Sequence, residues 1–538
     1  MRSCNTLRQS AIVSNTASAS QRSAWRRDTA AILVICLFGG LLFFYHLGQG
    51  SLHDWDDAIY AQVAKEMARS GDWLTEHYEY KPWFEKPPLF IWSTALLFRL
   101  FGITEFWARA ASALFGIAVL ILTYAIGRYI YSRWVGVISV LVMLTSVLYL
   151  RYARRAMIET TLIFFLVLAI YGYLHLQRGG QRWWYAVWAA LALAIMSKSF
   201  AASFALATLA LAIVFEGRTR SVLRSKHFWL GALLAVLIVA PWHVLMYLHH
   251  GTAFLNAYLF FNASRLTNTL EGNAGGPTFY LSTLDKGMFP WFYLVPFALG
   301  LSVWENLRGN VRSRILLLFV AVTFIICTVV RTKILWYILP LCPPLAILIA
   351  SMLVDAWRSP RSFGLAGLLV GTFAVALVSS QHAVVVVGVC VVLIVAIFLL
   401  WLYRQASWAL AFTCSAFLLL SGIYNIRLVY AEGDSPIARL GRMSRASSAS
   451  DRDPLILYSG ISAPAAVFYS DRPVIIVDTR QGLTDALSHD ESHRIILNER
   501  DIPSLRPEYS IDVAATISGI AYGRISHSYD LCTTCTRK

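Results

Sequence analysis

The stretch HDWDDAIYAQVAKEMARSGDWLTEHYEYKPWFEKPPL, residues 53–89, is a polar island in an otherwise apolar chain. It lies between hydrophobic runs long enough to cross a bilayer, and it carries two charged pairs, Asp56-Asp57 and Glu85-Lys86. Charged groups at a membrane are costly and usually mark function. We therefore expect this island to hold part of an active site.

The composition is that of a polytopic membrane protein. Of 538 residues, 57% are hydrophobic and only 14% are charged, whereas soluble domains carry roughly a quarter charged residues. The formal net charge of +16 could indicate a nucleic-acid partner. However, the positive residues fall mainly in short loops on one side of the spans, which is typical of membrane proteins, so we expect no nucleic-acid binding.

Hydrophobic runs of membrane-spanning length predict about thirteen transmembrane helices in an all-α bundle. Residues 1–28, rich in Ser, Ala and Arg, are predicted to be a disordered cytoplasmic tail. A membrane domain follows over 29–425, with an outer loop at 49–88. The runs lie near 30–48, 106–127, 134–150, 157–176, 183–197, 200–215, 228–248, 289–304, 315–330, 334–354, 363–380, 383–402 and 407–425.

Arginine clusters give the predicted orientation. They recur in loops after alternate spans, from Arg26 before the first span to Arg404 before the last. Loops rich in Lys and Arg stay in the cytoplasm, so the N-terminus is predicted to be cytoplasmic, in a bacterial inner membrane. The island, the loop 249–288 and everything after about residue 426 then lie outside.

The outer segment 426–538 predicts a small mixed α/β domain. Its short apolar runs LILYSG, AAVFYS and PVIIVD are separated by turn residues and are predicted to be strands, and SHRIILNERDIPSL adds another strand and a turn. Near the end of the chain, Cys532 and Cys535 form a C-x-x-C motif. No second pair or histidine accompanies it, which favours a disulfide or a plain tail over a zinc site.

The start of the island predicts a short amphipathic helix. Asp56 is a good N-cap, Asp57 suits the first turn because of the helix dipole, and Gly71 suits the C-terminal end. Apolar residues between them form a stripe, so this helix is expected to lie along the membrane surface. Helix initiation alone could account for Asp57, whereas Asp56 is the stronger candidate for catalysis.

Basic residues at the predicted outer face run against the usual charge distribution. They include Arg151, Arg154, Arg155, Lys198, Arg265 and Lys333. Binding to a phosphate at the outer leaflet would explain them, because Lys and Arg bind phosphate by charge and donor geometry. The alternative is that each side chain merely extends to lipid headgroups.

Carboxylates accompany these cations. Glu159 follows the arginines after the third span, and Glu85 precedes Lys86 at a Pro-Pro pair. One acid could deprotonate an acceptor hydroxyl while the cations stabilise a departing phosphate, which suits the transfer of an activated sugar. The alternative for Glu85 and Lys86 is a local ion pair that neutralises both.

The charged pairs belong to a longer set of short motifs. These are Asp56-Asp57-x-x-Tyr60-Ala61, Ala64-x-Glu66-Met67, Gly71-Asp72-Trp73, Phe84-Glu85-Lys86-Pro87-Pro88-Leu89, Phe101-Gly102, Arg109-x-x-Ser112-Ala113-Leu114 and Lys333-x-x-x-Tyr337-x-x-x-Leu341-x-x-Pro344. Together they resemble the ArnT-like glycosyltransferases. That group includes the aminoarabinose transferase acting on lipid A and the wider protein-mannosyltransferase relatives.

The resemblance implies the GT-C fold, with outer interfacial helices and an active site at the outer face. It also implies a donor sugar on a polyprenyl phosphate and inversion at the anomeric carbon. Asp56 and Glu159 take catalytic positions, with Asp57 beside them, and Glu85 takes a tentative metal position. Together with the outer-face charges, the resemblance assigns substrate or phosphate binding to Lys86, Arg154, Arg155, Lys198, Arg265, Lys333, Tyr60 and Tyr337.

Three positions depart from the family pattern. Asp57 stands where the family usually has Glu, and Ile59 stands where an Arg is common. Asn262 stands three residues before Arg265, where the family often has His. Because Asn is a poor zinc ligand, this last departure weakens the expectation of a bound zinc.

We therefore predict a monomeric integral membrane glycosyltransferase that moves a sugar from a polyprenyl-phosphate donor to a lipid A-like glycolipid, with a divalent metal as a candidate cofactor. A protein hydroxyl or a cell-wall glycan is the alternative acceptor. The rival from another class is a transporter or lipid flippase. Transporters usually show internal repeats and ionisable residues near mid-membrane, whereas the acids here cluster at one predicted face.

Overall fold

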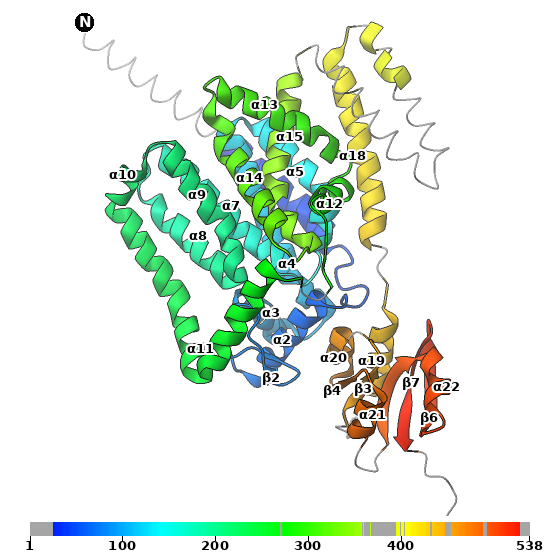
Figure 1. The fold of residues 1–538 in the computed structure, drawn as a ribbon. Coiled ribbons are helices and arrows are strands. Elements are labelled where there is room, and N and C mark those ends of the chain that lie inside the picture. Colours follow the sequence, from blue (N-terminus) through cyan, green and yellow to red (C-terminus); the bar gives the residue numbers. More distant parts are fainter. Residues whose placement is uncertain are drawn as a thin grey trace, which may run out of the picture.

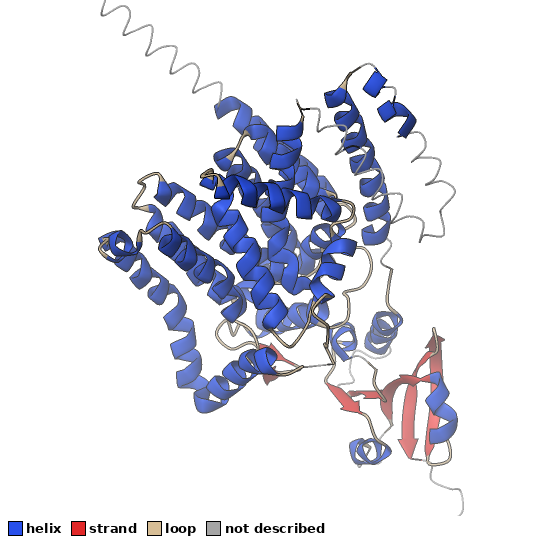
Figure 2. Ribbon diagram, turned by 45° about the horizontal axis from the view of Figure 1, so that its top comes forward, coloured by secondary structure: helices blue, strands red, loops and turns tan. Residues whose placement is uncertain are grey.

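The computed structural model describes residues 25–357 except 270–271, residues 394–430 except 399 and 403, and residues 433–527 except 447–452, 462 and 488–491, with 359 and 366 besides. The predicted runs at 363–380 and much of 383–402 lie outside the described residues, as does the Cys532/Cys535 motif. Helices make up most of the described chain, and a five-stranded β-sheet unit lies at one end (Figures 1 and 2).

Seven described helices are long and apolar enough to cross a membrane, or up to nine if two bent pairs count as one span each. The thirteen predicted spans are therefore not all present in the described part of the chain. The seven are Trp25–Phe44, α4 (Glu105–Ile130), α7 (Glu159–Gln177), Trp183–Phe215, α11 (Lys226–Thr267), Val311–Val329 with α14 (Arg314–Val329), and Leu335–Ala356 with α15 (Cys342–Ala356).

The predicted spans 134–150 and 289–304 are each a pair of helices that meet at a sharp bend. The first consists of α5 (Arg133–Leu144) and α6 (Val147–Ala153), which meet at 75°, so this run does not form one straight helix. The second consists of α12 (Phe279–Gly287) and Trp291–Leu307, which includes α13 (Val295–Leu307), at 117°.

The first helix extends into the predicted disordered tail. Residues 25–28 are helical, and Asp28 forms ion pairs with Arg128 and Arg133 at the junction of α4 and α5. The tyrosine hydroxyl of Tyr124 also donates to Asp28, at 2.9 Å. These contacts fix the start of the helix against the bundle.

Helix α8 (Trp183–Lys198) and α9 (Ser203–Phe215) run in opposite directions beside α7. Lys198, at the end of α8, pairs with Glu159 at the start of α7, whereas Gln177 at the end of α7 donates to Glu216, just after α9. The chain reverses at Lys198 and Ser199, whose backbone angles are not helical. A charged side chain thus lies at the turn.

Helix α11 is too long for one membrane crossing, because 42 residues extend for roughly 63 Å at 1.5 Å per residue. It bends at Gly251, whose φ of 57° favours glycine. Its last part turns back toward α2 and α3 (Figure 1). The predicted loop 249–288 is thus largely helical, since it contains the end of α11 and all of α12.

The polar island forms α2 (Asp56–Ser70), a small hairpin of β1 (His77–Tyr78) and β2 (Lys81–Pro82), and the approach to α3 (Leu89–Phe101). Gly71 ends α2 as predicted, with a φ of 75° and its N–H bonded to Met67 O. Trp55, rather than Asp56, occupies the N-cap position. The helix is also not a surface helix, because both its apolar and several polar side chains are buried between α3 and the C-terminal unit.

The C-terminal unit is a five-stranded mixed sheet of order β4-β3-β5-β7-β6. Strand β3 is parallel to β4 and β5, and the β6–β7 hairpin closes through Ser518-Gly519, both at positive φ. The predicted strand AAVFYS is wrong: it belongs to helix α20. The elements are α18 (Ala406–Tyr430), α19 (Pro436–Ala446), β3 (Leu455–Tyr458), α20 (Ala463–Ser470), β4 (Val474–Val477), α21 (Arg480–Ala486), β5 (His493–Asn498), α22 (Ile502–Leu505), β6 (Tyr509–Ile517) and β7 (Ile520–His527).

An ion-pair cluster joins α2 to this unit. Asp471, directly after α20, accepts from Arg69 at 2.5 Å and pairs with the buried Lys65 at 2.8 Å. Lys65 Nζ also donates to the carbonyl of Phe468 at 2.7 Å. Burial alone would raise the pKa of Asp471, but the hydrogen bonds from Arg69 and Lys65 outweigh it and hold the pKa well below its usual range.

We predict that Asp471→Asn weakens this junction by about 2 kcal/mol, because it leaves Lys65 buried without its counter-charge. Hydrogen exchange should become faster in α2 and α20. The same loss should appear in the unsubstituted protein at low pH, because a depressed carboxyl pKa contributes stability that disappears as pH falls through the folded value.

Asp512→Asn is the matched control, since Asp512 is exposed on β6. If hydrogen exchange in α2 were as slow in Asp471→Asn as in the unsubstituted protein, the ion pairs would not hold the junction.

Candidate active site

Asp56 and Asp57 begin α2 with different surroundings. Asp57 is buried, and its carboxylate accepts from the backbone N–H of His53 at 2.8 Å and of Ala156 at 2.6 Å. It therefore ties the island to the chain between α6 and α7, and both of its oxygens are used in this junction. Asp56 is only partly buried and accepts a hydrogen bond from Tyr60 at 3.1 Å.

Lys86 and Arg265 both lie against the ring of Phe261. The Lys86 ammonium lies 4.3 Å from the ring centre of Phe261, and the Arg265 guanidinium lies 4.4 Å from it. Arg265 also donates to the hydroxyl of Tyr337 at 2.5 Å. Burial lowers the pKa of Lys86 to about 8, with a further lowering from Arg265, which the carboxylates of Glu85 and Asp56 oppose.

Glu159 and Lys198 form an ion pair at the edge of the helix bundle. Glu159 is buried at the first turn of α7, and the Lys198 ammonium donates to its Oε1. Lys198 also lies 4.7 Å from the ring centre of Tyr337. Asp56 is near enough to act electrostatically on both Lys86 and Lys198.

Several of these side chains line a largely apolar groove of about 770 Å³. Its polar lining residues include Glu159, Lys198, Asn262, Arg265 and Tyr337. The remaining lining is apolar or aromatic and comprises Leu162, Ile163, Phe200, Ala201, Phe204, Leu266, Ile326, Val330, Trp336 and Pro340, with Ser203 and Cys327. A ligand with an anionic head and a hydrocarbon chain matches both parts.

The structure therefore brings together eight of the predicted residues. They come from the island, from the starts or ends of α7 and α8, from the turned-back part of α11, and from the 3-10 segment Leu335–Leu341 before α15. The eight are Asp56, Tyr60, Glu85, Lys86, Glu159, Lys198, Arg265 and Tyr337.

Two residues predicted to bind phosphate, Arg154 and Lys333, donate to backbone carbonyls. Arg154 donates to the carbonyls of Leu42, Phe43 and Tyr45, each at 2.8 Å, and so caps the end of the first helix. Lys333 donates to three carbonyls at the end of α14, at 2.5 to 3.0 Å. Carbonyls at helix ends lack partners within their helix, so both cations satisfy backbone acceptors.

Comparisons with known proteins find similar sequences and a similar fold. The family of dolichyl-phosphate-mannose-protein mannosyltransferases matches residues 85–245. A protein of Aquifex aeolicus is 28% identical over 315 residues, which are 58% of this chain and 62% of that protein. The undecaprenyl phosphate-alpha-4-amino-4-deoxy-L-arabinose arabinosyl transferase of Aeromonas salmonicida is 27% identical over 368 residues, or 65% of this chain. The match spans 66% of that relative, just under two thirds of its length.

Among solved structures, ArnT from Cupriavidus metallidurans bound to undecaprenyl phosphate superposes with a TM-score of 0.71. The match covers 92% of this chain and 98% of that one at 20% identity. The chain is ArnT-like in sequence and in fold. The predicted resemblance is thus confirmed, and so is the multi-pass bacterial membrane protein with a GT-C fold. The archaeal oligosaccharyltransferase AglB from Archaeoglobus fulgidus shares the fold more distantly, with a TM-score of 0.56.

The predicted metal position of Glu85 finds no support in the side chains around it. Within the described residues there is no group of three or more His, Cys, Asp or Glu side chains able to hold an ion. The Asn262 amide, which replaces the histidine common in ArnT-like proteins, donates to the carbonyls of Tyr258 at 2.8 Å and Glu85 at 3.5 Å. The Asn262 side chain is thus used in backbone contacts. We therefore derive no step through a metal.

Two residues of the site were missed by sequence reasoning. Phe261 lies four residues before Arg265, which puts both on one helix face, and this spacing could have identified it. Glu76 is fully buried, and neither of its carboxylate oxygens has a hydrogen-bond partner among the described residues. Burial raises the pKa of Glu76 well above its usual value, whereas the neighbouring Lys86 lowers it.

We predict that Glu76→Gln stabilises the protein at neutral pH. A raised carboxyl pKa contributes stability below the unfolded value near 4.5 and loses it as pH rises toward the folded value. The two proteins should unfold at similar temperatures near pH 4.5, and the variant should gain up to about 1.4 kcal/mol per pH unit above it. Thermal unfolding in detergent at several pH values measures the difference.

Glu499→Gln, at an exposed position, supplies the control for loss of a carboxylate. A difference between the Glu76→Gln and unsubstituted proteins that does not change with pH would contradict a protonated Glu76.

Proposed function

We propose that this protein is a membrane glycosyltransferase that takes its sugar from a polyprenyl-phosphate donor. The observation that carries the proposal is the nearness of one half-buried carboxylate, Asp56, to the buried Lys86 and to the half-buried Lys198 and Arg265, two of which line an apolar groove. The relatives named for undecaprenyl-phosphate arabinosyl transfer, and the ArnT structure bound to undecaprenyl phosphate, support the same donor class.

The groove suits the lipid part of such a donor. Its apolar side chains can cover hydrocarbon, which removes that surface from water. At its polar end, Lys86, Arg265 and Lys198 are held by Phe261, Tyr337 and Glu159 and can bind the phosphate. Charge-assisted contacts of this kind also favour the extra negative charge on a departing phosphate.

Asp56 is placed to act on the acceptor. An acceptor oxygen attacks the anomeric carbon while the bond from that carbon to the donor phosphate oxygen breaks. The bonding electrons go to the phosphate, which the cations stabilise, and the acceptor proton goes to Asp56. A single displacement of this kind inverts the anomeric centre. Tyr60 orients the Asp56 carboxylate, while Glu159 acts through Lys198 as a positioning residue.

The favoured acceptor is a lipid A-like glycolipid, with a protein hydroxyl or a cell-wall glycan as the alternative. We place the site on the periplasmic face of the inner membrane, with a cytoplasmic N-terminus, the unit 426–538 in the periplasm, and a monomer as the working state. A transporter is the rival function. A transporter is disfavoured because the charged residues gather beside the groove, on the face that we place outside the membrane. A path across the membrane is not needed to explain these residues.

Asp56→Asn tests the catalytic assignment. Loss of the base should lower the rate of sugar transfer from the lipid donor by 10²-fold or more, because general base catalysis typically contributes about that much. Donor binding and thermal unfolding should stay near their original values, since within the described chain the Asp56 side chain forms a hydrogen bond to one other side chain, Tyr60. Radiolabelled sugar on the acceptor is the readout.

Asp512→Asn again serves as the matched control. Transfer by Asp56→Asn at the unsubstituted rate would remove Asp56 from the mechanism, and substrate that only crosses the membrane without forming a product would favour the transporter.

Lys86 gives a prediction about pH. With a pKa of about 8, its ammonium loses its proton above that pH and can no longer attract the donor phosphate. Donor kcat/KM should therefore fall by about tenfold per pH unit above pH 8. Lys86→Arg should move this fall to higher pH, because a guanidinium stays protonated. Initial rates at limiting donor measure both proteins, and identical alkaline limbs would exclude Lys86 as the titrating group.

A further inference from the structure

The C-terminal unit is wound in both directions around its central parallel strand. Strand β3 lies between β4 and β5 and is parallel to both. Successive residues of a strand point to opposite faces of the sheet. Leu455 shares a buried cluster with Ala465 of α20, whereas its neighbour Ile456 shares a second cluster with Leu483 of α21. The two connecting helices therefore cover opposite faces.

This topology opens a crevice beside the ends of β3 and β5. The chain leaves β3 toward the face of α20, and it leaves β5 toward the other face, where Ile502 of α22 packs. In sheets of this kind, ligands bind outside the carboxyl ends of such a strand pair. The surface is hollowed at this place, and the hollow is lined by Asn498, Glu499, Arg500 and Gly519. We call it the sheet-edge crevice.

The backbone around the sheet-edge crevice is held in one conformation. Ser459 and Gly460, directly after β3, have φ of 58° and 70°, a region that L residues other than glycine seldom adopt. The side-chain amide of Asn498 donates to the carbonyl of Ser459 at 3.2 Å, and the N–H of Gly460 donates to the carboxylate of Asp478 at 3.2 Å. The ends of β4 and β5 thus fix the turn that leaves β3.

This edge of the sheet lies at the catalytic end of α2. The N–H of Ala465, near the start of α20, donates to the Asp54 carboxylate at 3.2 Å. Asp471, directly after α20, pairs with Arg69 in the last turn of α2. Because α20 begins just after β3, the carboxyl edge lies beside the start of α2. Asp56, the proposed base, is the first residue of that helix.

The charges at the sheet-edge crevice disfavour a phosphate. Glu499 lines it, Asp478 lies beside it, and Asp501 faces Arg500 at 3.9 Å, so acids outnumber the one arginine. The start of α20, where an anion could otherwise bind, already donates to the Asp54 carboxylate.

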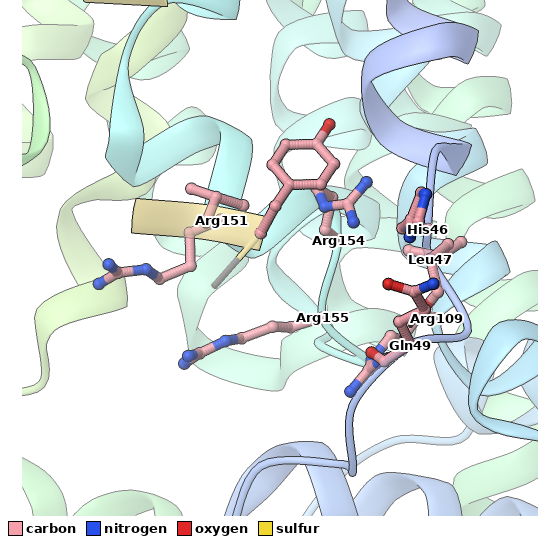
Figure 3. A pocket seen from close by; sticks show the side chains of 9 residues that line it. His46, Leu47, Gln49, Arg109, Arg151, Arg154 and Arg155 are labelled. Atoms are coloured by element: carbon pink, nitrogen blue, oxygen red, sulfur yellow. Dashed lines mark hydrogen bonds between the residues drawn. The ribbon is translucent and has the colours of Figure 1, made fainter. Parts of the chain in front are cut away.

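The cavity at the end of the first helix has the opposite charge. Four of its lining residues are arginines, namely Arg109, Arg151, Arg154 and Arg155 (Figure 3). Such a concentration of one charge attracts an anion. The sheet-edge crevice therefore suits a different chemical group.

The lining of the sheet-edge crevice suits hydroxyl groups. None of its four lining residues has an apolar side chain that could cover hydrocarbon. Within the described residues no group of three or more His, Cys, Asp or Glu side chains could hold a metal ion there. Glu499 can accept two hydrogen bonds, Arg500 can donate several, and the Asn498 amide can do both. Neighbouring hydroxyls on a sugar ring offer donors and acceptors at matching positions.

We propose that the sheet-edge crevice is a carbohydrate site that holds the uncharged sugar part of the acceptor. This rests on the proposed function and adds to it a means of recognising a glycan. The acceptor hydroxyl would react beside Asp56 while another sugar of the same molecule is held at the edge of the sheet. The C-terminal unit would then select the acceptor, and the membrane domain would bind the donor.

Arg500→Ala tests the site by binding. The probes are maltose and a disaccharide of N-acetylglucosamine, which carry neither phosphate nor acyl chain, and the full-length protein is held in nanodiscs. At least one disaccharide should show saturation transfer in NMR, and Arg500→Ala should weaken its binding about tenfold, because a hydrogen bond to a charged group is lost. Arg506→Ala, at another exposed arginine of the same unit, is the matched control.

Glycerol at the same hydroxyl concentration separates sugar recognition from general polyol binding. Failure of both disaccharides to bind, or a response to glycerol that Arg500→Ala lowers equally, would overturn the carbohydrate site. Thermal unfolding of Arg500→Ala should match that of the unsubstituted protein, because its side chain is 82% exposed.

The transfer assay separates this proposal from the proposed function. Arg500→Ala should raise the acceptor KM about tenfold and leave the donor KM and kcat near their original values. Disaccharide binding that depends on Arg500, without any sugar transfer, would overturn the proposed function and keep the carbohydrate site. Sugar transfer with the same acceptor KM in Arg500→Ala and in the unsubstituted protein would overturn the carbohydrate site and keep the proposed function.

Discussion

The carboxylate of Asp57 is the constraint on which the active site depends. Its two oxygens accept from the backbone of His53 and of Ala156, which joins the start of the polar island to the chain between α6 and α7. Glu159 follows three residues later, and Asp56 precedes Asp57, so one buried acid sets the distance between the two others. A buried ionised carboxylate is costly unless hydrogen-bonded, and both oxygens here are satisfied. The junction with Asp471 holds the opposite end of α2.

With α2 fixed, the cations can be held close together without a ligand. Lys86 and Arg265 repel each other, and burial adds to the cost of their charge. The face of Phe261, the hydroxyl of Tyr337 and nearby carboxylates offset part of this cost. A phosphate that enters the groove would relieve the remaining repulsion. The binding energy would then come from charges that are already positioned, with little side-chain entropy to lose on binding.

Much of this site could be predicted from the sequence, because the motifs around Asp56, Lys86 and Tyr337 lie where helices begin or end. The residues that begin or end a helix can be recognised from the sequence. The end of α2 at Gly71 is one example. Other features depend on tertiary structure. The run AAVFYS is short enough to be helix or strand, and packing against α2 decides for helix. Gly251 redirects α11, so a predicted loop becomes the helix that carries Arg265. Arg154 and Lys333 have the same chemistry as Arg265, and only the nearby helix ends assign them to carbonyls.

An arginine that caps a helix can still attract a ligand through its charge. A guanidinium has five donors, and Arg154 uses one nitrogen for three carbonyls of the first helix. Its charge is not neutralised by those partial dipoles, and its position is fixed by the helix end. The fold thus supplies a stationary positive potential as a by-product of satisfying its own backbone. Sequence position alone could not reveal this, because four arginines of one chemical type line the cavity at this helix end.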